Sequence, residues 1–132
     1  MAIDNVCSIS YSRKNKNQRE LVLKPGNYEV LVYRDRSGES PYREWLESLD
    51  WKTQDRIVLR VARLKWGQFG DFKALDGGLY ELRLFFGPGY RVYFGEHGGK
   101  MVLLLSGGDK STQKQDIKTA KEFWKHYLED NT

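Results

Sequence analysis

Cysteine, histidine and long apolar runs are scarce in this sequence. Its single cysteine, Cys7, excludes an internal disulfide and fits a reducing cytoplasm. The two histidines, His97 and His126, have no ligand spacing between them, so we expect neither a metal site nor a cofactor. No run approaches the roughly 18 apolar residues of a membrane span, and the N-terminus lacks an apolar signal core. We therefore expect a cytoplasmic protein that makes no membrane contact.

Positive charge is in excess. Lysine and arginine number 22 against 18 acidic residues, a net charge of +4, which favours an anionic partner. The 132 residues, 39% of them hydrophobic, suffice for one domain and are short for two. Residues 1–26 are polar and show no periodicity, which predicts a tail, and residues 27–132 form the predicted domain. Residues 107–111 are Gly-rich but lack Walker spacing, so no nucleotide or other small-molecule ligand is expected.

The hydrophobic periodicity predicts an α+β domain. Four strands, two helices after the first strand and one C-terminal helix follow in the order β-α-α-β-β-β-α. The strands joined by short turns indicate a mainly antiparallel sheet, and the all-apolar run 101–105 predicts a central strand covered on both faces. The expected strands are 28–33, 79–86, 90–94 and 101–105, and the expected helices are 41–48, 54–66 and 113–128.

The most regular pattern is a hairpin around Gly87-Pro88-Gly89. We expect Phe86 to pair with Tyr90, which sets Arg83 opposite Tyr93 and diagonal to Arg91. One face of this hairpin is apolar. The other carries Glu81, Phe85, both arginines and the tyrosine. It fits either a solvated surface or a phosphate site, because guanidinium forks match phosphate oxygens.

Basic side chains also recur along the second predicted helix. Arg56, Arg60 and Arg63 repeat at helical spacing beside an apolar stripe. They fit an ordinary solvated face, or contact with RNA phosphates or an acidic partner. The lysine stripe on the last helix, by contrast, is typical of a solvated face.

The polar residues support one reaction without a metal ion. RNA can be cut when its own 2′-hydroxyl attacks the adjacent phosphate, if the enzyme moves two protons and stabilises the charged phosphorane. The sequence provides cations and hydroxyls for these tasks. The candidates are Lys73, Arg83, Arg91, Tyr93 and Lys110.

Several stretches resemble the addiction-module killer proteins, which are toxins of the RelE/ParE superfamily in its HigB-like branch. The resemblance runs from about residue 28 to residue 128. The stretches that carry it are Glu81-Leu82-Arg83, residues 87–94 (GPGYRVYF), residues 103–105, residues 107–113 (GGDKSTQ) and Asp116-Ile117. It implies a RelE-like fold and the toxin of a type II toxin–antitoxin system. That toxin would be a ribosome-dependent endoribonuclease, an mRNA interferase that inhibits translation.

The resemblance also implies site residues and partners. Carried over by motif, Arg83, Arg91, Tyr93 and Lys110 are the catalytic candidates, and Lys73 and Asp109 contact the substrate, to which the helix pattern adds Arg60 and Arg63. Some relatives use histidines where this chain has Asp109 and Lys110, so the proton carrier stays open. The expected partners are the ribosome, messenger RNA and a cognate antitoxin, often a helix-turn-helix DNA-binding protein.

Two other functions fit the same sequence. One is a ParE-type toxin that inhibits gyrase without RNA chemistry, and the other is a non-catalytic basic domain that binds a partner. Tyr93 and Lys110 beside two arginines favour the nuclease, because a pure binder needs no proton-transfer groups.

Overall fold

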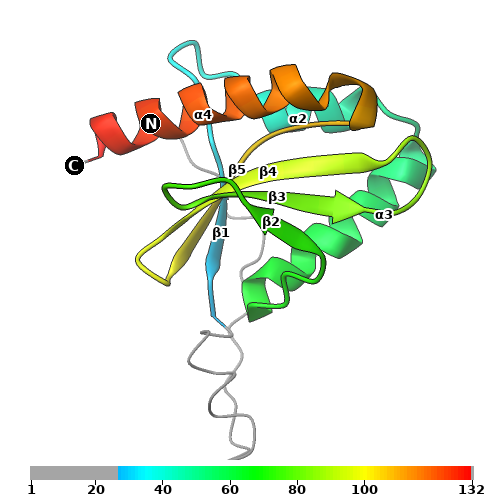
Figure 1. The fold of residues 1–132 in the computed structure, drawn as a ribbon, viewed down its shortest axis with the longest axis horizontal. Coiled ribbons are helices and arrows are strands. Elements are labelled where there is room, and N and C mark those ends of the chain that lie inside the picture. Colours follow the sequence, from blue (N-terminus) through cyan, green and yellow to red (C-terminus); the bar gives the residue numbers. More distant parts are fainter. Residues whose placement is uncertain (1–26, 132) are drawn as a thin grey trace, which may run out of the picture.

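The structure is a computed structural model that describes residues 27–131 (Figure 1). The predicted tail, residues 1–26, lies outside the described residues. The helices and strands follow in the order β1 (Glu29–Val32), α2 (Pro41–Glu47), α3 (Trp51–Ala62), β2 (Phe72–Ala74), β3 (Leu79–Leu84), β4 (Tyr90–His97), β5 (Met101–Gly108) and α4 (Gln113–Asp130). Two short 3-10 helices, η2 (Arg63–Trp66) and η3 (Lys110–Thr112), extend α3 and precede α4.

The strands form one five-stranded sheet in the order β1-β5-β4-β3-β2. β1 runs parallel to β5, and the other neighbours are antiparallel. The α+β class and mainly antiparallel sheet are therefore confirmed, whereas the predicted number of four strands is wrong. The missed strand is β2, inside the predicted loop 67–78. It has three residues, all exposed, and pairs only at the sheet edge, so it carries no alternating pattern.

The sheet separates two hydrophobic cores. α3 covers one face together with α2, and α4 crosses the other (Figure 1). β5 contributes to both cores, with Val102 and Leu104 in the first and Leu103 and Leu105 in the second. This confirms the predicted central strand. Among the described residues, no helix is both long enough and apolar enough to cross a membrane.

The helix boundaries follow from local capping. The Ser40 side chain accepts a hydrogen bond from the backbone of Arg43, and Pro41 occupies the first turn of α2, where its missing N–H costs nothing. Asp50 caps α3 in the same way, accepting from the backbone and hydroxyl of Thr53. The first cap starts α2 where the sequence indicates, whereas α3 begins at Trp51, inside the stretch expected to link the two helices.

The hairpin differs from its predicted pairing by two residues. Arg83 lies opposite Arg91, Glu81 opposite Tyr93, and Leu84 opposite Tyr90. The loop is longer than expected because residues 85–89 all lie outside the ladder, with a turn closed by Gly89 donating to the carbonyl of Phe86 (3.1 Å). A shift of two residues keeps every side chain on its predicted face, since strand side chains alternate with period two.

Candidate functional site

A buried carboxylate organises the α4 side of the hairpin. Glu81 is completely inaccessible to solvent. It accepts hydrogen bonds from Nε of Arg83 (3.1 Å), the hydroxyl of Tyr93 (3.2 Å) and the amide of Gln113 (2.8 Å). Nε of Arg91 lies 3.6 Å from the same carboxylate. Glu81 therefore joins two strands to the first turn of α4, and its charge is balanced by two arginines.

The two arginines differ in exposure. The side chain of Arg83 is 32% exposed and that of Arg91 is 13% exposed. Arg91 also donates from Nη1 to the carbonyl of Gly89 (2.7 Å), so its guanidinium is held on two sides. Arg83 is held at Nε, on one edge of its planar fork. The geometry thus makes Arg83 the surface cation and places Arg91 behind it. Both lie on one face, as the alternation predicts.

Tyr93 lies below this surface rather than on it. Its ring is completely buried in the core under α4, and its hydroxyl donates to Glu81. Burial raises the pKa of Tyr93 far above its usual range, and the adjacent Glu81 carboxylate raises it further. The hydroxyl therefore stays protonated and faces Glu81. Tyr93 has no open path to a substrate in this structure, which corrects the expectation of a surface tyrosine.

The end of β5 brings Lys110 to the same surface. Asp109 caps η3, and its carboxylate accepts from the backbone and the hydroxyl of Ser111. The Ser111 hydroxyl lowers the pKa of Asp109, so this cap is ionised near neutral pH. Lys110 follows directly and is exposed. It lies beside the hairpin loop, where a Cβ added at Gly89 would stand 3.6 Å from Cβ of Lys110 and 3.2 Å from Nη1 of Arg91.

Lys73 occupies the edge of this face. It pairs with Glu81 across β2 and β3, so its side chain shares the face of Glu81 and Arg83. It is exposed, at the outer strand of the sheet. We call the group of Lys73, Arg83, Arg91 and Lys110 around buried Glu81 the hairpin site.

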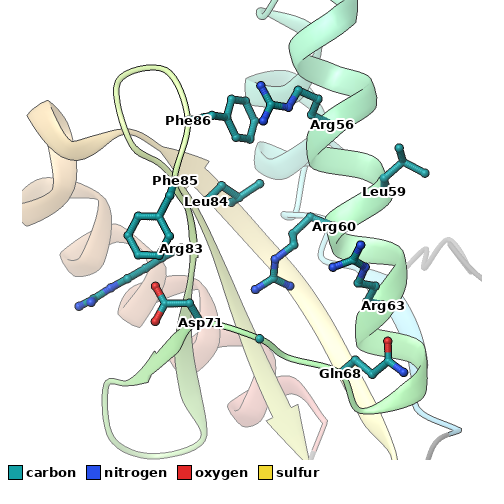
Figure 2. A pocket seen from close by; sticks show the side chains of 11 residues that line it. Arg56, Leu59, Arg60, Arg63, Gln68, Asp71, Arg83, Leu84, Phe85 and Phe86 are labelled. Atoms are coloured by element: carbon teal, nitrogen blue, oxygen red, sulfur yellow. The ribbon is translucent and has the colours of Figure 1, made fainter.

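Arg60 and Arg63 do not join the hairpin site. They line a cleft of about 520 Å³ between α3 and the hairpin loop, and Arg83 also contributes to its lining. In Figure 2, Arg60 and Arg63 extend from α3 toward this cleft, whereas the guanidinium of Arg83 turns away from α3. Nη2 of Arg60 donates to the carbonyl of Phe69 (2.7 Å). The predicted substrate-binding residues thus fall into two groups, Lys73 and Asp109 near the hairpin site and Arg60 and Arg63 at the cleft, and Arg83 borders both.

Sequence reasoning missed the residues at the centre of the hairpin site. The sequence analysis assigned no role in the site to Glu81, which belongs to the ELR stretch, or to Gln113. The signal for Glu81 was present, because an acid on the same strand face as Arg83 and Arg91 is placed to pair with them. Gln113 carried no such signal, since its contact spans 32 residues of sequence. Within residues 27–131, no group of three or more His, Cys, Asp or Glu side chains is placed to hold a metal ion.

The part of the chain that matches known proteins contains the whole hairpin site. Residues 44–125 match the family described as "Phage derived protein Gp49-like (DUF891)". An uncharacterised protein from Haemophilus influenzae is 47% identical over 81 residues, which are 61% of this chain and 82% of that protein. The family match runs from α2 into α4 and includes all four cations of the hairpin site together with Glu81.

Proposed function

Because the chain belongs to the Gp49-like family, which is part of the RelE/HigB-like toxin superfamily, we propose that it is the toxin of a type II toxin–antitoxin system. In this proposal it is an endoribonuclease that cleaves messenger RNA on the ribosome and inhibits translation. The observation that carries the proposal is the pair Arg83 and Arg91 beside the buried carboxylate of Glu81, with Nε of Arg83 donating to it and Nε of Arg91 3.6 Å from it.

The proposed reaction is attack by an RNA 2′-hydroxyl on its own 3′-phosphate. A bond forms from the 2′-oxygen to phosphorus, the bond to the 5′-oxygen breaks, and a proton moves from the first oxygen to the second. Arg83 presents the outer edge of its guanidinium to the phosphate oxygens, where charge develops in the transition state. Arg91 adds positive charge from behind. These two roles follow from their exposures of 32% and 13%.

Proton transfer falls to Lys110 in this proposal. Its ammonium group is exposed beside Arg91 and can donate a proton to the departing 5′-oxygen. Tyr93 acts indirectly, because its hydroxyl donates to Glu81 and holds the carboxylate that orients the arginines. Lys73 and Asp109 support the site, the first by adding charge at the sheet edge and the second by capping the turn that carries Lys110.

The openness of the hairpin site supports a need for the ribosome. Its exposed cations Lys73 and Lys110 and the partly exposed Arg83 lie on a sheet surface at a hairpin loop. An enzyme gains much of its rate by holding the reacting groups in line, and here the decoding site would provide that orientation. Free RNA should therefore be a poor substrate. We also propose a cognate antitoxin as the neutralising partner.

Induced expression in a bacterial host tests this function. We expect the wild-type chain to arrest growth and to leave cuts within translated messages. Arg83→Ala should abolish both, because it removes the surface cation of the site. Lys125→Ala, which removes an exposed cation of α4, is the matched control and should remain toxic. Intact messages together with gyrase-dependent DNA breaks would contradict the proposal and favour the ParE-type function.

A further inference from the structure

A hollow on the α3 side of the sheet has a lining unlike that of the hairpin site. It has a volume of about 590 Å³ and is lined in part by residues 67–70, which follow η2. Phe72 and Tyr80 face it from β2 and β3, on the side of the sheet opposite to Lys73 and Glu81, because strand side chains alternate. Four aromatic rings belong to its described lining, those of Tyr28, Phe69, Phe72 and Tyr80. We call this hollow the aromatic pocket.

The rings of the aromatic pocket hold one another in place. The centroids of Phe69 and Phe72 lie 5.5 Å apart with the ring planes at 86°, and those of Phe72 and Tyr80 lie 5.7 Å apart with the planes at 67°. Tyr80 also stacks on the buried ring of Phe94, at a centroid distance of 5.4 Å. Phe72 nevertheless remains 44% exposed, and Phe69 and Tyr80 are half-buried. The pocket therefore presents aromatic surface that is fixed in orientation and accessible to a ligand.

A carboxylate borders these rings. Glu96 is half-buried and is the one charged side chain among the described residues that line the aromatic pocket. Its backbone N–H donates to the carbonyl of Gly78 (2.8 Å), and its Oε2 accepts from the hydroxyl of Tyr28 (3.2 Å). Burial raises the pKa of Tyr28 to about 12 and the Glu96 charge adds to the rise, so this hydroxyl stays a donor. Within residues 27–131 Glu96 forms no ion pair, so its charge has no cation beside it.

The combination of ring faces and one carboxylate selects the class of ligand. The face of an aromatic ring attracts cations, and the carboxylate adds a second attraction of the same sign. A primary ammonium has three N–H groups to satisfy, whereas the pocket offers few free acceptors, since the carbonyl of Phe69 already accepts from Arg60. A methylated ammonium needs no acceptor and presents its methyl groups to the rings. A nucleotide could stack here, but its phosphate would meet the negative charge of Glu96.

We propose that the aromatic pocket binds a quaternary ammonium group, with its methyl groups against Phe72 and Tyr80 and its charge toward Glu96. This chemistry occurs in free small cations and on trimethylated lysine side chains of proteins. The proposal does not rest on nuclease activity, because none of the residues of the hairpin site lines the pocket. The pocket adjoins the cleft between α3 and the hairpin loop at Gln68 and Gly70, which line both.

Choline and its neutral carbon isostere test the aromatic pocket. In the isostere a tert-butyl group replaces the trimethylammonium group, so the two probes have the same shape and differ in charge. Each is titrated into the full chain, and NMR chemical shifts of backbone amides and aromatic rings report binding. We expect saturable binding of choline, with the shifts centred on Phe72, Tyr80 and Glu96. The isostere should bind at least about tenfold more weakly, because it gains neither the cation–π nor the ionic attraction.

Two peptides then distinguish the sources of the ligand. One carries trimethyllysine, and the other has the same sequence with unmodified lysine. Tighter binding of the methylated peptide than of choline would assign the pocket to a modified protein side chain. Equal or weaker binding of that peptide would assign it to a free cation. In both cases the unmodified peptide should bind more weakly than the methylated one.

Matched variants separate the pocket from general attraction to the chain. Glu96→Gln keeps the shape of the side chain and removes its charge, so it should weaken choline by about tenfold. Glu122→Gln makes the same change at an exposed position of α4 and should leave the affinity within about twofold. Phe72→Leu removes a ring and should weaken choline by about threefold or more. Phe85→Leu makes that change at a ring outside the pocket lining and should leave the affinity within about twofold.

The proposal fails if choline does not bind saturably, or if its carbon isostere binds equally well. It also fails if Glu96→Gln and Glu122→Gln lose the same affinity, which would show attraction by net charge. A third contrary result is displacement of choline by adenosine monophosphate whose own affinity falls in Phe72→Leu, which would assign the rings to a nucleobase. Phe72 is an exposed residue of the edge strand β2, so Phe72→Leu is expected to fold and gives a reading independent of Glu96.

Discussion

Replacement of Glu81 by glutamine tests how the hairpin site is held together. The side chain keeps its shape and loses its charge. The carboxylate accepts three hydrogen bonds and lies 3.6 Å from Nε of Arg91. A glutamine offers one acceptor oxygen and adds an N–H₂ group that faces donors. Arg83 donates to Oε1, whereas Tyr93 and Gln113 both donate to Oε2, so the N–H₂ group of a glutamine faces either Arg83 or the other two donors. In both orientations the two arginines lose their counter-charge.

The size of the effect follows from these contacts. Removing one partner of a buried ion pair costs about 3–5 kcal/mol, because the remaining charge is left without compensation. Arg83 is one third exposed and regains water, which reduces the cost at that arginine. We expect Glu81→Gln to lower the free energy of unfolding by about 3 kcal/mol. The melting temperature should fall by about 10 °C for a chain of this size.

Urea unfolding followed by circular dichroism measures this loss. Glu96→Gln is the matched control, because Glu96 is partly buried and its carboxylate accepts a hydrogen bond from the Tyr28 hydroxyl (3.2 Å). The control should cost about 1 kcal/mol or less, the usual net value of one hydrogen bond. Equal stabilities for the two variants would refute the view that Glu81 organises the site.

Three further predictions concern other parts of the fold. Tyr93→Phe should lower the free energy of unfolding by about 1–2 kcal/mol, because the hydrogen bond to Glu81 is lost. It should keep measurable RNA cleavage, because the hydroxyl is buried. Complete loss of cleavage in a folded variant would show that Tyr93 is a catalytic group. Gly107→Ala should destabilise the chain by about 1–3 kcal/mol in thermal unfolding, because the added Cβ would overlap the Trp45 ring. An unchanged melting temperature would contradict the close packing of α2 on β5. The Thr53 hydroxyl lowers the pKa of Asp50, so the ionised carboxylate stabilises the fold above its unfolded pKa, and this stability is lost as pH falls through the lower folded pKa. Asp50→Asn keeps a cap that does not titrate, so its free energy of unfolding should fall less than that of the wild type between about pH 5 and pH 3. Equal falls in the free energy of unfolding over this range would contradict the prediction.

The sequence predicts the architecture well wherever apolar periodicity is strong. The alternation in β3 and β4 and the all-apolar core of β5 place these strands within a few residues. The sequence does not predict β2, because all three of its residues are exposed and a strand paired at the sheet edge needs no apolar face. The hairpin register could not be predicted from the side-chain pattern, because loop length sets it and a two-residue shift leaves the pattern unchanged.

The candidate site is less readable from sequence than the fold. Alternation places Arg83 and Arg91 on one face, and the structure agrees. It does not reveal how deep each side chain lies, because that depends on α4, which covers Tyr93 and brings Gln113 to Glu81. Arg60 and Arg63 illustrate the same difficulty. A basic helical stripe carries no information on which side of the sheet it will face.

The most direct test of the proposed function is the fate of one nucleotide on the ribosome. Translating ribosomes are given the purified chain and a message whose cut position carries either a normal ribose or a 2′-O-methyl group. The account predicts cleavage of the normal message only, with a 5′-hydroxyl on one fragment and a 2′,3′-cyclic or 3′-phosphate on the other, and loss of this cleavage in Arg83→Ala. Cleavage of the 2′-O-methyl message at the same position would contradict it.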